Sequence, residues 1–181
     1  RFRTVGVISV ALGCPFEGDV DPAVVAADVA RFASLGVSLV TIGDTVGTAT
    51  PRKVKSLFNV LLREIPDVVP VAHFHDTRGT AIANNLAALE AGCTHFDAAL
   101  GGVGGHPAEI QYGSGQTGNV STEDLVSVLE AEGLNTGLDL DKMMQLSERC
   151  EAALNRPLYS KVARAGLLAA QSKIPQKGLA I

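Results

Sequence analysis

Four short runs of apolar and β-branched residues punctuate the N-terminal part of the chain, at residues 5–12, 38–42, 68–74 and 95–100. Apolar residues fill each run continuously and do not alternate strictly with polar ones. Strands that are buried on both faces, as in parallel sheets, have this pattern. The chain is therefore predicted to form about four buried parallel strands.

Segments with helical periodicity separate these runs, at residues 22–35, 51–63 and 80–90. Asp21 and Thr50 each precede a proline, which is typical of a helix start because a capping side chain is followed by proline at the first helical position. Further helices are expected from about residue 121 and over 139–154, and the tail from 163 is expected to be partly helical. Alternating strands and helices predict an α/β protein with a parallel sheet.

The composition is that of a globular protein and excludes several functions. Apolar residues make up 46% of the chain and charged residues 19%, and 15 Lys and Arg against 19 Asp and Glu give a net charge of −4. A mildly acidic chain lacks the basic face that nucleic acids require. No apolar run approaches the roughly 18 residues of a membrane span, so no membrane partner is expected. Cys14, Cys93 and Cys150 form no CxxC pair, which favours the cytoplasm, or the mitochondrial matrix in a eukaryote.

The length of 181 residues fits one domain over residues 1–181, without an interdomain linker. It is nevertheless short of the roughly 250 residues of a complete eight-stranded β/α barrel. The chain starts at Arg1 and passes almost at once into a predicted strand, as expected of a fold entered midway.

Polar residues and glycines gather where each predicted strand ends. These segments are Gly-Cys-Pro-Phe-Glu-Gly at 13–18, Gly-Asp-Thr-Val-Gly at 43–47, His-Phe-His-Asp-Thr-Arg-Gly at 73–79 and Gly-Gly-Val-Gly-Gly at 101–105. In parallel β/α proteins the active site lies at the carboxyl ends of the strands. The pattern therefore predicts one functional site built from these loops.

His73 and His75 are the sharpest signal among these loops. Residues two apart on a strand point to the same face, so both imidazoles are expected to enter the site together. Neutral imidazoles are natural metal ligands. The alternative is one hydrogen-bonded core histidine and one loop histidine. Asp76 follows directly, as a carboxylate behind a ligand or as a catalytic group.

Three further features have both a structural and a functional interpretation. Asn119 follows a glycine and is either a turn residue or an oxygen ligand for a metal. Asp44 either caps the following helix or places a carboxylate in the site. The glycine run at 101–105 lacks the Lys-Ser/Thr of a phosphate-binding loop and is better interpreted as a mobile lid.

Together with Gly-Asn-Val-Ser-Thr-Glu-Asp-Leu at 118–125, these loops resemble the 3-hydroxy-3-methylglutaryl-CoA lyase family. That family is one of the metal-dependent carbon–carbon lyases and synthases on TIM barrels, which include isopropylmalate synthase. The resemblance covers about residues 4–165. It implies the C-terminal half of a (β/α)8 TIM barrel, with about four parallel strands and trailing helices.

The resemblance implies that His73, His75 and Asn119 are metal ligands. Such mixed nitrogen and oxygen ligands suit Mg²⁺ or Mn²⁺, with Zn²⁺ less favoured. The sequence departs from the family in two places. The fourth metal ligand of the family, an Asp in an Arg-Asp-Gly motif, has no counterpart here. The family cysteine after the glycine run is His106, in a segment about four residues longer than usual, and His can also transfer protons.

The implied reaction is the retro-Claisen cleavage of a 3-hydroxy-3-methylglutaryl-CoA-like thioester to acetyl-CoA and acetoacetate. Asp44 or Asp76 would remove the proton of the substrate hydroxyl, and His106 would protonate the resulting carbanion. Glu123 would support Asn119 or the glycine run.

Three alternatives stay open. The first is a lyase for another 3-hydroxy-3-carboxylate acyl-CoA such as citramalyl-CoA, which His106 and the longer segment favour. The second is a synthase that runs the condensation, which the glycine run disfavours. The third is a non-catalytic relative, against which the intact HxHD and Gly-Asn motifs argue. Because half a barrel leaves strand edges unpaired, we expect either further N-terminal residues or a homodimer.

Overall fold

The computed structural model describes residues 2–104 and 118–168. The chain divides into two compact units, and the single partial-barrel domain over residues 1–181 stays a prediction. The first unit holds the described residues up to 98 together with 104, 118 and 119. The second holds residues 99–103 and 120–168. His106 lies outside the described residues, so its role stays a prediction.

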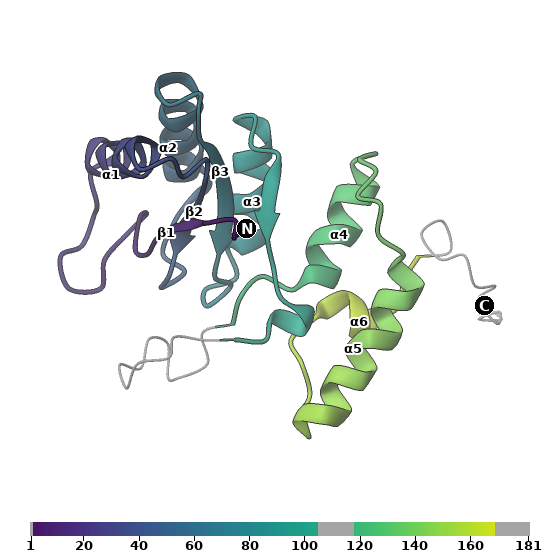
Figure 1. The fold of residues 1–181 in the computed structure, drawn as a ribbon. Helices are drawn as coiled ribbons and strands as arrows, with labels where there is room; N and C mark the ends of the chain where they lie inside the picture. Colours follow the sequence, from purple (N-terminus) through teal and green to yellow (C-terminus); the bar gives the residue numbers. More distant parts are fainter. Residues whose placement is uncertain (1, 105–117, 169–181) are drawn as a thin grey trace, which may run out of the picture. The chain divides into compact units, whose positions relative to one another are not determined.

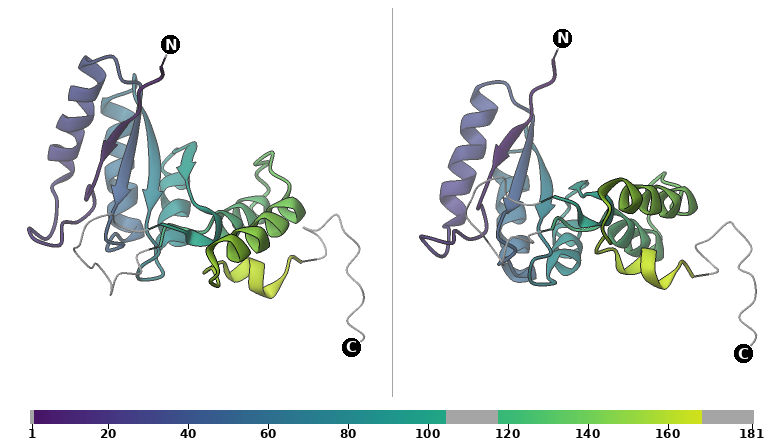
Figure 2. Two further views of the ribbon diagram at one scale, coloured as in Figure 1. Left: turned by 60° about the horizontal axis from the view of Figure 1, so that its bottom comes forward. Right: turned by 90° about the horizontal axis from the view of Figure 1, so that it is seen from below.

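A parallel four-stranded sheet with its strands in chain order forms the centre of the first unit. Its strands are β1 (Gly6–Ile8), β2 (Leu39–Asp44), β3 (Val69–Phe74) and β4 (His95–Asp97). The connecting helices are α1 (Pro22–Ser34), α2 (Pro51–Glu64) and α3 (Ala81–Glu90). Because such crossovers are right-handed, this strand order places all three helices on one face of the sheet (Figure 1, Figure 2). The predicted α/β class with parallel strands is confirmed.

The first and last strands are shorter than predicted. Residues 5–12 contribute only three residues to β1, because the chain then turns and its backbone bonds to the end of β2. The N–H of Val10 donates to the Thr45 hydroxyl at 2.8 Å, and that of Ala11 donates to the Gly43 carbonyl at 2.9 Å. Strand β4 ends at Asp97, and Leu100–Gly102 form a 3₁₀ turn, η1, instead of a strand end.

Both predicted caps at the prolines are formed. Asp21 accepts a hydrogen bond from the N–H of Ala23 at 2.9 Å, and Thr50 accepts one from the N–H of Lys53 at 3.5 Å. Each helix then starts at a proline, whose missing N–H costs nothing in the first turn. These local rules explain why the helix boundaries follow the sequence prediction closely.

Register across the sheet sorts its side chains into two faces. Ile42 and Ala72 are partners in neighbouring strands and are fully buried on the helix-covered face, where Phe58 of α2 packs edge-on against Phe74 with ring centroids 6.1 Å apart. One residue further along, His73 is the partner of Asp97, so these two side chains share the opposite face. One face of the sheet therefore packs against the helices in an apolar core, and the opposite face carries the polar side chains of His73 and Asp97.

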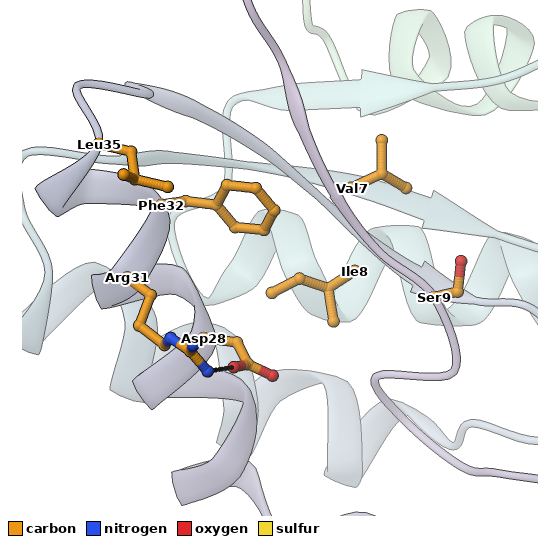
Figure 3. Close-up of a pocket in the computed structure, with 7 residues that line it drawn as sticks. All are labelled: Val7, Ile8, Ser9, Asp28, Arg31, Phe32 and Leu35. Carbon is orange, nitrogen blue, oxygen red and sulfur yellow. Dashed lines mark ion pairs between the residues drawn. The ribbon is translucent and has the colours of Figure 1, made fainter.

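The outer edge of β1 pairs with no strand within the described part of the chain. A cavity of about 440 Å³ lies along this edge, between β1 and α1 (Figure 3). Val7 is 61% exposed and Leu35 is 78% exposed, and an ion pair between Asp28 and Arg31 at 3.7 Å lies at the margin. An open strand edge with apolar flanks is the surface against which another strand pairs.

The second unit contains the trailing helices. They are α4 (Thr122–Ala131), α5 (Leu140–Leu154) and α6 (Lys161–Ala165). Their core is a small cluster of Val126, Leu140, Met143 and Leu167. Across both units, none of the described helices has the length and apolarity needed to cross a membrane.

Gly101 is tightly packed within the second unit. Its φ is +55°, and a Cβ at this position would lie 2.4 Å from the Cβ of Leu158. Its carbonyl accepts a hydrogen bond from the N–H of Tyr159 at 3.0 Å, so the backbone cannot move away. The start of the glycine run therefore requires glycine.

We expect Gly101→Ala to lower the free energy of unfolding by about 1–3 kcal/mol, because the new methyl group overlaps Leu158. Gly133→Ala is the matched control: Gly133 also has a positive φ, of +83°, but nothing lies within 4 Å of its added Cβ. Thermal and urea unfolding followed by circular dichroism measure both. Equal losses in the two variants would contradict the packing explanation.

Candidate functional site

The two histidines of the HxH motif lie together at the carboxyl end of β3. Their ring centroids are 5.3 Å apart and their planes are inclined at 65°. His75 is 6% exposed, and the side chain of His73 is 27% exposed. The same-face arrangement expected from their spacing is therefore present.

A carboxylate that the sequence analysis did not single out contacts the first histidine. Oδ2 of Asp97 lies 2.9 Å from Nδ1 of His73, between neighbouring strands. Asp97 lies inside the fourth apolar run, at 95–100, and no separate sequence signal marks it. Only the strand register shows that it stands opposite His73. Asp76, which was one candidate for the carboxylate behind a ligand, instead accepts a hydrogen bond from the N–H of Ala81.

Asn119 joins the histidines through the backbone. It forms an isolated antiparallel bridge with His75, and the N–H of Asp76 donates to the carbonyl of Gly118 at 3.0 Å. A Cβ at Gly104 would lie 2.6 Å from Nδ2 of Asn119, so a side chain there would displace the amide. The structure thus brings together the three predicted metal ligands, although they come from distant parts of the sequence.

Asp44 is fully buried at the end of β2 and is bonded to the following loop. Its Oδ1 accepts from the N–H of Thr48 and its Oδ2 from the N–H of Ala49, both at 3.0 Å. Burial raises the pKa of Asp44 above its ordinary value of 3.8, although these two N–H bonds and the Arg78 guanidinium favour the charged form. Asp44 thus holds residues 45–49, and its part in catalysis stays a prediction.

The same loop is held from the β3–α3 side. Nη1 of Arg78 donates to the carbonyl of Val46 at 2.5 Å, and Nδ2 of Asn84 donates to the carbonyl of Ala49 at 3.1 Å. A Cβ at Gly47, whose φ is +64°, would lie 3.0 Å from the carbonyl oxygen of His75. The loops after β2 and β3 are therefore packed against each other directly beside the histidines.

Asp76 caps helix α3. Its Oδ1 accepts from the N–H of Ala81 at 3.0 Å, whereas Thr80 at the cap position makes no side-chain cap bond. Asp76 is half-buried, in contrast to the fully buried Asp44. Its role as a base stays a prediction.

Glu123 holds the glycine run within the second unit. Its carboxylate oxygens accept from the N–H of Gly101 at 2.8 and 3.0 Å, and from the hydroxyls of Ser121 at 2.6 Å and Ser147. Glu123 is fully buried, and Gly101 and Gly102 are also buried. The start of the expected lid is therefore a fixed turn, while residue 105 lies outside the described residues.

The candidate metal set consists of two imidazoles and one amide. Among the residues that the structure describes, no group of three or more His, Cys, Asp and Glu could hold a metal ion. His73, His75 and Asn119 instead offer two nitrogen donors and one oxygen donor at one rim. The carboxylate of Asp97 contacts Nδ1 of His73. This donor set fits a divalent cation.

Comparison with known proteins matches this site to one family. The HMGL-like family model matches residues 3–149. Human mitochondrial hydroxymethylglutaryl-CoA lyase is 42% identical over 160 residues, which cover 88% of this chain and 48% of the relative. Rat cytoplasmic 3-hydroxy-3-methylglutaryl-CoA lyase is 43% identical over 164 residues, which cover 91% of this chain and 47% of the relative. The chain thus spans about half the length of the curated relatives it matches.

Solved structures give the same result. The hydroxymethylglutaryl-CoA lyase of Pseudomonas aeruginosa aligns with a TM-score of 0.84 at 37% identity, over 90% of this chain and 53% of that one. An HMG-CoA lyase from Acinetobacter baumannii, in complex with coenzyme A and 3-methylmalate, aligns with a TM-score of 0.82 at 40% identity, over 94% and 55%. The carboxyl transferase domain of Rhizobium etli pyruvate carboxylase is more distant, with a TM-score of 0.65 at 26% identity, over 83% of this chain and 24% of that one.

The sheet, the histidine pair beside Asn119 and the match over most of the sequence lead to one conclusion: the chain belongs to the HMGL-like family.

Proposed function

We propose that the protein containing this chain cleaves 3-hydroxy-3-methylglutaryl-CoA to acetyl-CoA and acetoacetate. The observation that carries the proposal is the pair of contacting imidazoles, His73 and His75, beside Asn119 in a chain 42% identical to a lyase of this kind. The coenzyme A complex of the Acinetobacter relative supports an acyl-CoA thioester as substrate.

His73, His75 and Asn119 would hold a divalent metal, Mg²⁺ or Mn²⁺ in preference to Zn²⁺. When bound, such an ion supplies Lewis-acid polarisation and makes the substrate hydroxyl more acidic. The side chain of His75 is buried, and the backbone of His75 bridges to that of Asn119, so these two residues lie next to each other. Preformed donors reduce the ordering cost of binding.

Asp76 is the better candidate of the two carboxylates for removing the hydroxyl proton. Asp44 is fully buried, and both of its oxygens already accept backbone N–H groups. Asp76 is half-buried and directly follows His75 along the chain. We assign proton removal to Asp76 and loop positioning to Asp44.

The remaining steps balance around the broken carbon–carbon bond. Loss of the hydroxyl proton to the carboxylate allows the new ketone of acetoacetate to form as that bond breaks. The electron pair passes to the thioester fragment, and His106 returns a proton to its carbon to give acetyl-CoA. Glu123 keeps the start of the glycine run in one conformation through its bonds to Gly101.

A second candidate is a lyase for another 3-hydroxy-3-carboxylate acyl-CoA, such as citramalyl-CoA. His106 favours it, because this residue replaces the cysteine that the family resemblance implies. Comparing cleavage of the two thioesters by the purified protein decides between them.

A homodimer is our proposal for the assembly, and sedimentation tests it. For the compartment we propose the cytoplasm or the mitochondrial matrix, since the relatives are named as cytoplasmic or mitochondrial.

We expect His75→Ala, in the full-length protein, to abolish measurable Mn²⁺ binding and to lower kcat/KM for 3-hydroxy-3-methylglutaryl-CoA at least about 100-fold, because a donor is removed from the site. Calorimetry with Mn²⁺ and an acetoacetate assay measure the two effects. Chelation of the metal should stop cleavage, and added Mg²⁺ or Mn²⁺ should restore it.

His95→Ala is the matched control for this experiment. His95 lies on β4, is exposed, and interacts through Nδ1 with the hydroxyl of Thr94 at 2.9 Å. It should retain both metal binding and cleavage. Full activity in His75→Ala would end the proposed mechanism.

Replacing Asp44 tests its assignment to loop positioning. Asp44→Asn turns an NH₂ group toward the N–H of Thr48 or Ala49, and we expect it to lower the free energy of unfolding by about 1–3 kcal/mol. Asp67→Asn, at an exposed position, should have almost no effect. Urea unfolding measures both. A fully stable Asp44→Asn protein with collapsed kcat would instead identify Asp44 as the base.

A further inference from the structure

We propose that Asp97 is a positioning residue, which holds His73 in the tautomer and orientation that bind the metal; this inference rests on the proposed function. It names a residue outside the predicted ligand set.

The contact is built into the sheet. His73 of β3 and Asp97 of β4 are partners in the parallel register, so their side chains leave the same face side by side. Oδ2 of Asp97 lies 2.9 Å from Nδ1 of His73. The side chain of Asp97 is 50% exposed and that of His73 is 27% exposed. The carboxylate therefore reaches the ring from the more solvated side of the pair.

The chemistry of the two groups determines which nitrogen is free. An ionised carboxylate only accepts hydrogen bonds, and a neutral imidazole donates from one nitrogen and accepts at the other. The short contact therefore places the proton of His73 on Nδ1. The lone pair on Nε2 is then available for a cation, as in carboxylate–histidine–metal arrangements, where the carboxylate also makes the ligand more basic.

No other acidic side chain named in the site makes this contact. Asp44 accepts two backbone N–H groups of its own loop, and Asp76 caps α3. The second neighbour of the His73 ring is the ring of His75, with centroids 5.3 Å apart. A carboxylate and an imidazole thus hold His73 from two directions.

The test uses the full-length protein with Mn²⁺ as the probe. Asp97→Ala removes the acceptor, whereas Asp97→Asn retains an oxygen acceptor without the charge. We expect a 10- to 100-fold weaker Mn²⁺ affinity in Asp97→Ala, and a smaller loss in Asp97→Asn. The matched control is Thr94→Ala. It removes a hydroxyl that contacts His95, at the residue just before β4, and should leave the affinity unchanged.

A second readout reports the tautomer without any metal. In ¹⁵N-histidine-labelled protein, the nitrogen shifts of His73 should show a protonated Nδ1 in the wild type. Asp97→Ala should move part of the proton population to Nε2, and Asp97→Asn should largely restore the wild-type spectrum. A residue that only stabilised the fold would not change this equilibrium.

The outcomes separate this inference from the proposed function. Wild-type Mn²⁺ affinity or an unchanged His73 tautomer in Asp97→Ala overturns the role of Asp97, provided that His73→Ala loses the metal. Unchanged Mn²⁺ affinity in His73→Ala overturns the metal site itself, and the inference with it. Parallel loss of affinity and tautomer in Asp97→Ala, with partial rescue by Asp97→Asn, supports it.

Discussion

The parallel pairing of β2 with β3 is the constraint on which the site depends. Six residue pairs are in register, from Leu39 opposite Val69 to Asp44 opposite Phe74. Both strands therefore end at one level, and their loops must pack against each other. The close approach of Gly47 to the His75 carbonyl oxygen and the bond from Arg78 to Val46 are consequences of that shared end. The histidines gain a rigid base because the sheet beneath them is buried.

Carboxylates that accept backbone N–H groups recur throughout the described residues. Asp44 holds the loop after β2, Asp76 caps α3, and Glu123 holds the turn at Gly101. Asp124 likewise accepts from the Ser160 hydroxyl at 2.9 Å and from the N–H groups of Lys161 and Val162 at the start of α6. Loops that present chemistry at a strand end have backbone donors to satisfy, and acidic residues satisfy them. An acidic residue at a strand end is for this reason weak evidence of catalysis.

Prediction from sequence is strongest where a single residue type has one local consequence. Proline after a capping side chain placed the starts of α1 and α2, and continuous apolar runs identified the parallel strands. It was weaker where pairing between distant segments decides the outcome. Strand β1 is shorter than the predicted run at 5–12, because the chain turns and the N–H groups of Val10 and Ala11 donate to the Thr45 hydroxyl and the Gly43 carbonyl. The lid expected at 101–105 begins as a fixed turn, because the carboxylate of Glu123 and the side chain of Leu158 close around Gly101.

The family resemblance predicted His73, His75 and Asn119 as metal ligands, and the sequence by itself determined the order of strands and helices and the strand ends at which polar residues gather. These follow from periodicity, capping and motif spacing, all of which act along the chain. The tertiary structure alone decided that Asp97 is the carboxylate beside His73 and that Asp44 and Asp76 hold backbone groups. The physical reason is register. Which side chains face each other across strands depends on how the sheet aligns, and no local pattern encodes that alignment.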